Sequence, residues 1–340
     1  MRKWNPMQIL VVRNNSNPQA VDASMLLVAY LGEQGIRALV ADSASLGNDQ
    51  GRAAIRAQLP EVLDMAVVLG GDGTVLHTVH LLNNRQVPIL PVNFGRLGFL
   101  ANADDNGLIP LVAEALAGEL TAERRSVLSL DVACEGEPDP YGEDAEEVPY
   151  PQIVTEEDYA ASVDPDAAFV GGTMMPPDKF GVNLRGMAGI RRFIALNEIA
   201  ITRGALGRII ELSLGISGTH VARMRGDGLV VSTATGSTAY ALSAGGPLIS
   251  PRFGGMVAVP LAPHTLRSRA IVTDTSDVIE ITFDDTEDYR DATLFVDGEI
   301  VPFERSLQKI YVQVAPFPVT LLRANGASFY ERISHDFFGE

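Results

Sequence analysis

MAVVLGGDGT, residues 65–74, decides the fold expected of this chain. Its first half, Met65 to Leu69, is wholly apolar and predicts a buried strand, and the glycines that follow predict a turn that opens a helix over 75–82. The residues on either side repeat this pattern, with apolar strands expected at 8–12, 36–41 and 88–92 and helices at 20–34 and within 43–59. Mostly apolar strands that alternate with helices indicate a parallel sheet covered by helices on both faces.

From residue 126 the pattern changes to short apolar segments between turns, which predicts a second, β-rich domain. A chain of 340 residues is long enough for two domains. The tail from Ala324 to Glu340 is expected to form a short helix that packs back on the first domain. The segments expected to be strands are 126–133, 193–202, 208–216, 219–224, 228–232, 256–259, 270–273, 277–283, 293–296 and 309–314.

The charge of the chain is concentrated in one stretch. Residues 135–166 hold twelve acidic side chains and no Lys or Arg, and without them the net charge of −17 would be −5. Few aromatic residues, several prolines and charge of one sign indicate a long, solvated and mobile insertion at about 134–190. We therefore expect residues 135–166 to be dispensable for folding.

Composition also limits the partners and the compartment. Binding to nucleic acid needs a basic face, which this acidic chain does not suggest, whereas a few arginines and main-chain amides are enough to bind a small anionic molecule. The single cysteine, Cys134, cannot form an internal disulfide and fits a reducing compartment. No apolar run approaches the roughly 18 residues of a membrane span, and the N-terminus lacks a signal-peptide core, so we expect a cytoplasmic protein without membrane association.

The glycine turn is the strongest chemical signal. Gly70, Gly71, Gly73 and Thr74 place main-chain amides at the positive end of a helix dipole, where a polyphosphate can approach without meeting Cβ atoms. A carboxylate beside phosphates is repelled, so Asp72 fits either a bridge through Mg²⁺ or a base that takes a proton from an attacking hydroxyl. A purely structural alternative is that Asp72 caps the helix.

Three further segments carry polar groups in unusual places. NFGRLGFL, residues 93–100, follows a strand at the sheet edge where ligands bind in open α/β folds. ALNEIAI, residues 195–201, puts an amide and a carboxylate inside an apolar strand, so ribose hydroxyls, an adenine edge or a cross-strand hydrogen bond must satisfy the buried group. In residues 225–247 a strand enters a loop of hydroxyls and small side chains, where Tyr240 offers a flat face to a base; a loose Ser/Thr turn is the alternative.

Taken in order, these motifs closely resemble the NAD kinase family. They are GGDGT, NFGRLGFL, ALNEIAITR, GDGLVVSTATGSTAYALSAGGPLISP, APHTLRSR and VDGE, and the resemblance covers the chain except about residues 134–190. It implies a Rossmann-like α/β domain over 1–125, a β-rich, β-sandwich-like domain over 126–323 and an active site between them. The implied reaction transfers the terminal phosphoryl group of ATP, or of polyphosphate, to the 2′-hydroxyl of the adenosine ribose of NAD, giving NADP. It further implies a divalent cation, Mg²⁺ with ATP, and a homo-oligomer, dimer or tetramer.

The resemblance also implies roles for individual residues. Asp72 matches the general base of the family, Gly73 and His77 line the nucleotide site, and Asn197 and Glu198 match the pair that binds NAD. Two positions depart from the family pattern: Ala234 stands in place of a usual proline, and Glu299 stands where glutamine is often found. The remaining residues matched to NAD contacts are Arg208, Arg225, Asp227, Thr238, Ala239, Tyr240, Ala241, Leu242, Ser243 and Glu299.

Other functions share part of this pattern. GGDGT also occurs in diacylglycerol- and sphingosine-type lipid kinases and, slightly changed, in 6-phosphofructokinases, but these need neither the Asn-Glu pair nor the TGSTAY loop. Lipid kinases also need an apolar or basic surface that faces the membrane, and the composition suggests none. A non-catalytic NAD(P)-binding sensor of the same fold would not need Asp72.

Overall fold

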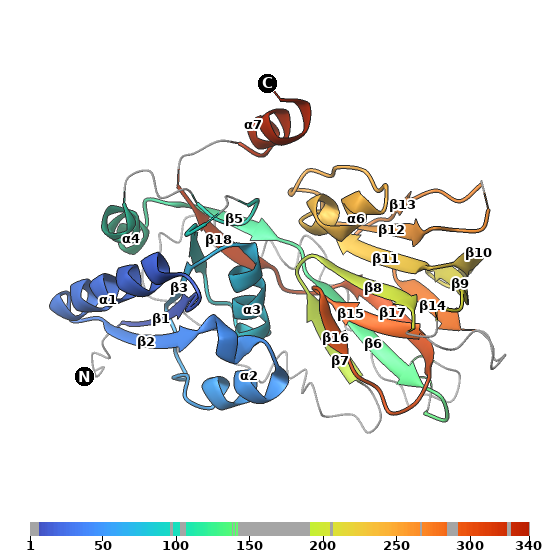
Figure 1. Ribbon diagram of the computed structural model, residues 1–340, viewed down its shortest axis with the longest axis horizontal. Coiled ribbons are helices and arrows are strands. Elements are labelled where there is room, and N and C mark those ends of the chain that lie inside the picture. The colour runs from blue at the N-terminus through green and yellow to red at the C-terminus, as the bar shows by residue number, and fades with distance from the viewer. Residues whose placement is uncertain are drawn as a thin grey trace. The chain divides into compact units, whose positions relative to one another are not determined.

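The structure, a computed structural model, divides the chain into two compact units, coloured along the chain in Figure 1. Unit 1 contains the described residues up to Arg125 and those from Val319 onward, and unit 2 contains the described residues between them. No helix in the described parts is long and apolar enough to cross a bilayer. The described residues are 7–95, 98–102, 107–137, 139, 141, 191–204, 207–265, 267–283, 292–324 and 328–339.

Unit 1 is built on a six-stranded sheet of order β2-β1-β3-β4-β18-β5. The first four strands in the chain and β18 run parallel, and β5 pairs antiparallel with β18. Every residue of β3 is buried, as its apolar sequence predicts. The strands are β1 (Gln8–Arg13), β2 (Arg37–Asp42), β3 (Met65–Leu69), β4 (Ile89–Val92), β5 (Thr121–Arg125) and β18 (Val319–Arg323).

Helices cover both faces of this sheet, which confirms the α/β architecture predicted for the first part of the chain (Figure 1). Helix α1 (Pro18–Glu33) begins where the side chain of Asn17 accepts hydrogen bonds from Gln19 N and Ala20 N. It packs with α4 (Leu108–Ala117) on one face, over the side chains of β1, β3 and β4. The other face is covered by α2 (Asp49–Arg56) and α3 (Asp72–Leu82).

The second domain expected over 126–323 ends earlier in the structure. Strand β18 (Val319–Arg323) returns to the first sheet, where Leu321 pairs with Ile89 of β4 and with Glu123 of β5. The second domain therefore ends before Val319, and not before Ala324 as expected. A short apolar strand has the same pattern in either sheet, so the sequence of β18 does not show which sheet it joins.

Unit 2 contains two antiparallel six-stranded sheets, of orders β10-β9-β14-β17-β6-β7 and β13-β12-β11-β8-β15-β16. One buried core contains side chains of both sheets, including Leu130 of β6 and Leu229 of β11, so the predicted β-sandwich is confirmed. The strands are β6 (Leu128–Cys134), β7 (Arg191–Ala195), β8 (Glu198–Arg203), β9 (Ile210–Ile216), β10 (Thr219–Gly226), β11 (Gly228–Thr233), β12 (Met256–Leu261), β13 (Ile271–Val272), β14 (Ile279–Phe283), β15 (Ala292–Val296), β16 (Glu299–Val301) and β17 (Leu307–Val314).

The single strand expected at 193–202 is wrong. Strand β7 ends at Ala195 in one sheet, and β8 begins at Glu198 in the other. Leu196 and Asn197 form the corner between the sheets, and the apolar residues on both sides of the Asn-Glu pair do not reveal it.

The beginning of the acidic insertion packs on unit 2. Glu137 pairs with Arg191 at 2.8 Å and accepts a hydrogen bond from Cys134 N. Asp139 accepts hydrogen bonds from Lys309 Nζ and Tyr311 OH. The expectation of a solvated loop is therefore wrong at these two positions, because cations on β7 and β17 face them. The rest of the insertion, from residue 142 to 190, lies outside the described residues.

This packing gives a prediction about the insertion. Replacement of residues 142–166 by a short Gly/Ser linker is expected to leave folding and catalysis intact, because this stretch carries nine acidic side chains and no Lys or Arg to pair with them. Extending the replacement back to residue 137 removes the pairs of Glu137 and Asp139 and should lower the thermal unfolding midpoint by about 2–6 °C. Scanning calorimetry of the two variants tests this; an insoluble or inactive 142–166 variant would contradict it.

Candidate functional site

The glycine turn lies between β3 and α3 in unit 1. Gly71 is the N-cap residue of α3 and accepts a hydrogen bond from Thr74 N at 2.9 Å. A Cβ atom on Gly70 would lie 2.4 Å from Thr74 Oγ1, so packing alone requires this glycine. A Cβ atom on Gly71 or Gly73 would meet nothing within 4 Å. The turn therefore leaves open space beside its second and third glycines, at the N-terminus of a helix.

Asp72 is the first helical residue of α3, so the structural alternative that it caps the helix is wrong, since the cap position is Gly71. Its half-buried carboxylate accepts hydrogen bonds from Phe99 N at 3.0 Å and Leu100 N at 3.1 Å. A Cβ atom on Gly98 would lie 2.3 Å from Asp72 Oδ2, so a glycine is needed for this close approach. Asp72 thus connects the glycine turn to the segment that follows β4.

The segment after β4 is fixed by two asparagines. Asn93 donates from Nδ2 to Gly95 O at 2.7 Å, and Asn93 Oδ1 is buried without a hydrogen-bond partner. Asn102 Nδ2 donates to Pro91 O and Leu322 O, both at 2.9 Å. The two segments, after β3 and after β4, follow the carboxyl ends of neighbouring parallel strands, which is the ligand-binding edge of open α/β sheets.

In unit 2, the corner that holds Asn197 and Glu198 is organised by Asp297. Asp297 Oδ2 accepts from Leu196 N at 2.8 Å, while Oδ1 accepts from Asn197 N at 2.7 Å and from Glu198 N at 3.1 Å. Asp297 itself has a positive φ of 47°, a conformation uncommon for residues other than glycine, in the turn between β15 and β16. The corner is therefore bound to this turn by three hydrogen bonds from its main-chain amides to the carboxylate of Asp297.

The hydroxyl-rich loop is bonded to the same corner and is not a loose turn. Ser232 Oγ donates to Asn197 O at 3.0 Å, and Thr233 Oγ1 donates to Leu196 O at 2.7 Å. A Cβ atom on Gly236 would lie 2.2 Å from Asn197 O, so this glycine is required for the approach of the loop. These bonds use the main chain of the corner and leave the amide side chain of Asn197 half-exposed.

Glu198 is a buried carboxyl group with one unsatisfied oxygen. The residue is 7% exposed, its Oε2 has no hydrogen-bond partner, and the carboxyl group also interacts with the main-chain amide of Tyr240. Burial, with a further contribution from the negative charge of Asp297, raises the pKa of Glu198 to about 8. At neutral pH this group is mostly a protonated acid, which can donate a hydrogen bond to a ligand hydroxyl or carbonyl.

The structure brings some of the predicted residues together and separates others. Asn197 and Glu198 lie beside the start of α6 (Tyr240–Ser243), which holds Tyr240, Ala241, Leu242 and Ser243; Thr238 and Ala239 directly precede that helix. Glu299 is opposite Val296 in the turn that Asp297 begins. His77 lies further along α3 in unit 1, half-buried.

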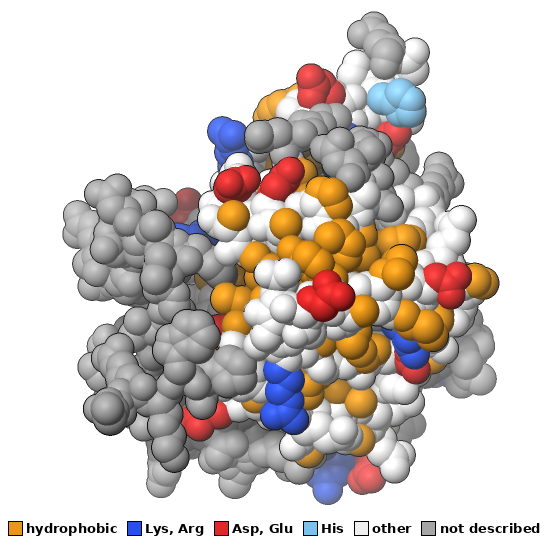
Figure 2. Space-filling view, turned by 90° about the vertical axis from the view of Figure 1, so that its left-hand side faces the viewer, with side chains coloured by type: hydrophobic (Ala, Val, Ile, Leu, Met, Phe, Trp, Pro, Cys, Tyr) orange, Lys and Arg blue, Asp and Glu red, His pale blue; other side chains and the backbone are white. Residues whose placement is uncertain are grey.

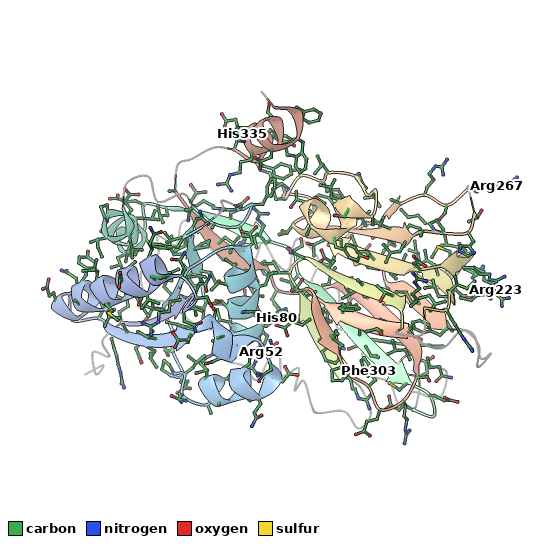
Figure 3. All side chains as sticks on the ribbon, in the orientation of Figure 1. Arg52, His80, Arg223, Arg267, Phe303 and His335 are labelled. Carbon is green, nitrogen blue, oxygen red and sulfur yellow. The ribbon has the colours of Figure 1, made fainter. Side chains whose placement is uncertain are left out.

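Arg225, Asp227 and Arg208 lie at the other end of the sandwich from Glu198. Along β11, Gly228 pairs with Thr202 and Ser232 pairs with Glu198, so Asp227 is one strand length away from the corner. Asp227 pairs with Arg203 at 3.2 Å, and Arg225 lies 3.7 Å from Glu211, beside Arg223, which Figure 3 labels. Arg208 is exposed just before β9.

Comparison with known proteins bears on this geometry. The sequence model of the family ATP-NAD kinase N-terminal domain matches residues 9–120. The sequence model of the family ATP-NAD kinase C-terminal domain matches residues 196–324. The NAD kinase of Aromatoleum aromaticum is 30% identical over 325 residues, which cover 95% of this chain and 90% of that protein. The chain belongs to the NAD kinase family. As a member of this family it is a phosphotransferase that makes NADP from NAD.

A further curated relative and two solved structures are also similar to this chain. The NAD kinase of Hahella chejuensis is 34% identical over 269 residues, covering 78% of this chain and 74% of that protein. The crystal structure of yeast NADH kinase complexed with NADH has a TM-score of 0.69 at 20% identity, with 98% of this chain and 88% of that chain covered. An Archaeoglobus fulgidus NAD kinase in complex with ATP has a TM-score of 0.62 at 21% identity, with 98% of each chain covered.

Sequence reasoning missed several residues that organise the site. Asp297 was included only as a member of the VDGE motif, and Gly98 was not singled out within its motif. The signal for Gly98 is present in hindsight, because it precedes the two amides that face the carboxylate of Asp72. Nothing local identifies Asp297, whose partners lie about a hundred residues earlier.

The pKa of Glu198 predicts how stability depends on pH. The native state keeps this proton up to about pH 8, whereas the unfolded chain releases it near 4.5. Between these values the native state binds more protons, so the free energy of unfolding falls as pH rises. Glu198→Gln removes this dependence, so between pH 6 and pH 8 the unaltered protein is expected to lose on the order of 2 kcal/mol of unfolding free energy that the variant keeps. Urea unfolding at pH 6 and pH 8 measures it.

The matched control is Glu33→Gln, which changes an exposed glutamate on α1. This variant should keep the pH dependence of the unaltered protein. If Glu198→Gln and Glu33→Gln show the same dependence, Glu198 is ionised in the native protein at neutral pH.

Proposed function

We propose that this chain transfers the terminal phosphoryl group of ATP to the 2′-hydroxyl of the adenosine ribose of NAD, and that Asp72 is the general base. The observation that carries the proposal is a carboxylate within a glycine turn that otherwise presents open backbone at the N-terminus of α3. Solved relatives of the same fold, complexed with NADH and with ATP, support the pair of substrates. Inorganic polyphosphate offers the same linked phosphates, so an assay of NADP formation should compare both donors.

The phosphate donor fits the turn formed by Gly70, Gly71, Gly73 and Thr74. Open space beside Gly71 and Gly73 admits phosphate oxygens, and α3, which is 11 residues long, directs its N-terminal amides toward them. Gly70 contributes differently, since its lack of a side chain lets the buried Thr74 pack against the turn. We therefore assign Gly71 and Gly73 to the phosphates and Gly70 to the shape of the turn.

Asp72 is suited to remove a proton from the ribose hydroxyl. An ionised carboxylate has about four acceptor positions, and the amides of Phe99 and Leu100 occupy one on each oxygen. Each oxygen can still accept the attacking hydroxyl. Because two main-chain donors fix the carboxylate, it is held in one orientation before the substrate arrives, as catalysis by positioning requires.

A divalent cation, Mg²⁺, would accompany ATP. Among the described residues there is no group of three or more His, Cys, Asp or Glu side chains arranged to bind a metal ion. Such a group is not required, because Mg²⁺ in kinases is bound by one or two carboxylates together with substrate phosphates. Asp72 is the carboxylate of the turn that would face it. The bound ion would neutralise charge that develops on the phosphoryl oxygens.

The dinucleotide acceptor fits the corner of unit 2. The protonated carboxyl of Glu198 and the amide of Asn197 can hydrogen-bond to its hydroxyls, and the exposed ring of Tyr240 offers a surface for a base. Thr238, Ala239 and the residues of α6 from Ala241 to Ser243 would line the same pocket, and Glu299 would join them from the turn that contains Asp297. These assignments rest on the resemblance and on the contacts among these segments.

Arg208, Arg225 and Asp227 lie one strand length away from that corner, so they bind another part of the dinucleotide or complete the site of a second copy. The expected homo-oligomer, dimer or tetramer, would allow the second arrangement. Figure 2 shows hydrophobic side chains gathered on one surface of unit 1, and Met25 and Leu26 of α1 are among the exposed hydrophobic residues of that unit.

We propose a cytoplasmic location, in line with the single cysteine and with the use of ATP.

Asp72→Asn tests the general base. The substitution keeps the size of the side chain but removes the proton acceptor, so kcat for NADP formation should fall about 10²–10⁴-fold, with a much smaller change in NAD binding. The amide group of the new side chain also faces a main-chain N–H, so a modest loss of stability is expected. Steady-state kinetics and calorimetry measure the two effects.

Asp64→Asn is the matched control, because Asp64 also accepts a main-chain hydrogen bond, from Gln8 N at 2.6 Å, at the beginning of the same sheet. It should keep the kcat of the unaltered protein. A well-folded Asp72→Asn protein with a near-normal kcat would show that Asp72 only joins α3 to the segment after β4.

Asn197→Ala tests the acceptor pocket. The main-chain bonds of Asn197 are unaffected by the change, so the corner should keep its shape. Loss of side-chain hydrogen bonds to NAD should raise the KM for NAD by about 5- to 150-fold, corresponding to about 1–3 kcal/mol, and leave the KM for ATP nearly unchanged. Equal changes in both constants would mean that Asn197 is structural. Asn48→Ala, which removes the cap of α2, is the control.

A further inference from the structure

The segment Gly98–Ala101 is hydrogen-bonded from both of its sides. On one side its amides donate to Asp72, as described above. On the other side its carbonyl oxygens accept from two arginines: Arg332 donates to Gly98 O at 2.8 Å and to Ala101 O at 3.4 Å, and Arg323 donates to Phe99 O at 2.6 Å and to Leu100 O at 2.7 Å.

Two peptide groups of this segment therefore connect the arginines to Asp72. The peptide between Gly98 and Phe99 accepts from Arg332 at its oxygen and donates to Asp72 at its nitrogen. The next peptide accepts from Arg323 at its oxygen and also donates to Asp72. A guanidinium at the oxygen and a carboxylate at the nitrogen polarise a peptide group in the same direction, so the bonds strengthen one another.

Arg332 belongs to the C-terminal segment, far from Asp72 along the chain. Helix α7 (Phe329–Ile333) begins with a capping box between Ser328 and Glu331, and a short π-helix at Ser334–Phe338 follows it. The ring of Phe99 packs against the rings of Phe329 and Phe337, each at a centroid distance of 6.2 Å. Figure 3 labels the exposed His335 on this segment. The contacts of Arg332 are thus supported by an aromatic cluster on the same segment.

The charged groups around Arg332 are consistent with its contacts to the segment Gly98–Ala101. Burial and the nearby Arg323 lower the pKa of Arg332, and the negative charges of Asp72 and Glu123 act in the opposite sense. Arg323 is paired with Glu123 at 2.8 Å, whereas the hydrogen bonds described for Arg332 go to main-chain carbonyls. The cation of Arg332 is therefore placed to act on the segment that orients Asp72.

We propose that Arg332 is a positioning residue for phosphoryl transfer, which acts through the peptide between Gly98 and Phe99 to orient the carboxylate of Asp72. Of the C-terminal segment, Arg332 alone is assigned this role. This inference rests on the proposed role of Asp72 as the base.

Arg332→Met tests the inference, because it keeps an unbranched apolar stem in place of the arginine stem and removes the guanidinium. We expect kcat to fall about 10- to 100-fold, the size of effect that a misplaced catalytic group produces, while the KM values for NAD and ATP change by less than about threefold. Arg332→Lys keeps the charge and a donor for one carbonyl, so it should recover part of kcat. His335→Ala, on the same segment, is the control and should behave as the unaltered protein.

A double variant separates positioning from a general loss of structure. If Arg332 acts through Asp72, Asp72→Asn combined with Arg332→Met should be no slower than Asp72→Asn alone. Losses that multiply would overturn the inference, as would an unchanged kcat in Arg332→Met. Should Arg332→Met fail to fold, Arg332→Lys decides the question: a lower kcat at constant KM supports the inference, and an unchanged kcat overturns it.

The same measurements keep the two proposals apart. A slow Asp72→Asn protein with a normal Arg332→Met protein leaves the proposed function intact and removes only the role of Arg332. A normal Asp72→Asn protein removes the base, and the role of Arg332 with it.

Discussion

In both units, an aspartate carboxylate that accepts hydrogen bonds from consecutive main-chain amides determines the local geometry. Asp72 does so for Phe99 and Leu100 in unit 1, and Asp297 does so for Leu196 to Glu198 in unit 2. Each bond has a charged acceptor and is worth roughly 1.5–3 kcal/mol, about twice a neutral hydrogen bond. Since these bonds fix the backbone beside the predicted ligand groups, the positions of Asn197, Glu198 and the glycine turn depend on them.

The fold could be predicted from the sequence because hydrophobic periodicity is a local property. The sequence predicts the buried strand Met65–Leu69 and the change to short strands after residue 126, and the structure contains both. Pairing between strands is not local, so the return of β18 (Val319–Arg323) to the first sheet was missed. The corner at Leu196 and Asn197 was missed for a related reason, since the apolar residues on both sides of the Asn-Glu pair have the same pattern whether they form one strand or two.

The candidate site was predictable to the extent that residue type alone reveals chemistry. A carboxylate among glycines and an Asn-Glu pair among apolar residues are conspicuous in sequence. Arginines are not: Arg332 lies 234 positions from Gly98 and has no local feature that distinguishes it from other surface arginines. The raised pKa of Glu198 also has no sequence signature, because it arises from burial and from Asp297 across a turn.

The placement of β18 has a consequence for how the protein is made. In the completed sheet, β5 is bonded to β18, and β18 is bonded to β4. While the ribosome has synthesised only the first 318 residues, β4 lacks its outer neighbour and β5 has no strand beside it. A nascent chain in this state presents an unpaired sheet edge, which is prone to association with other chains. Synthesis of unit 1 therefore begins first, but its sheet is completed last, and unit 2 can fold on the ribosome before unit 1 is complete.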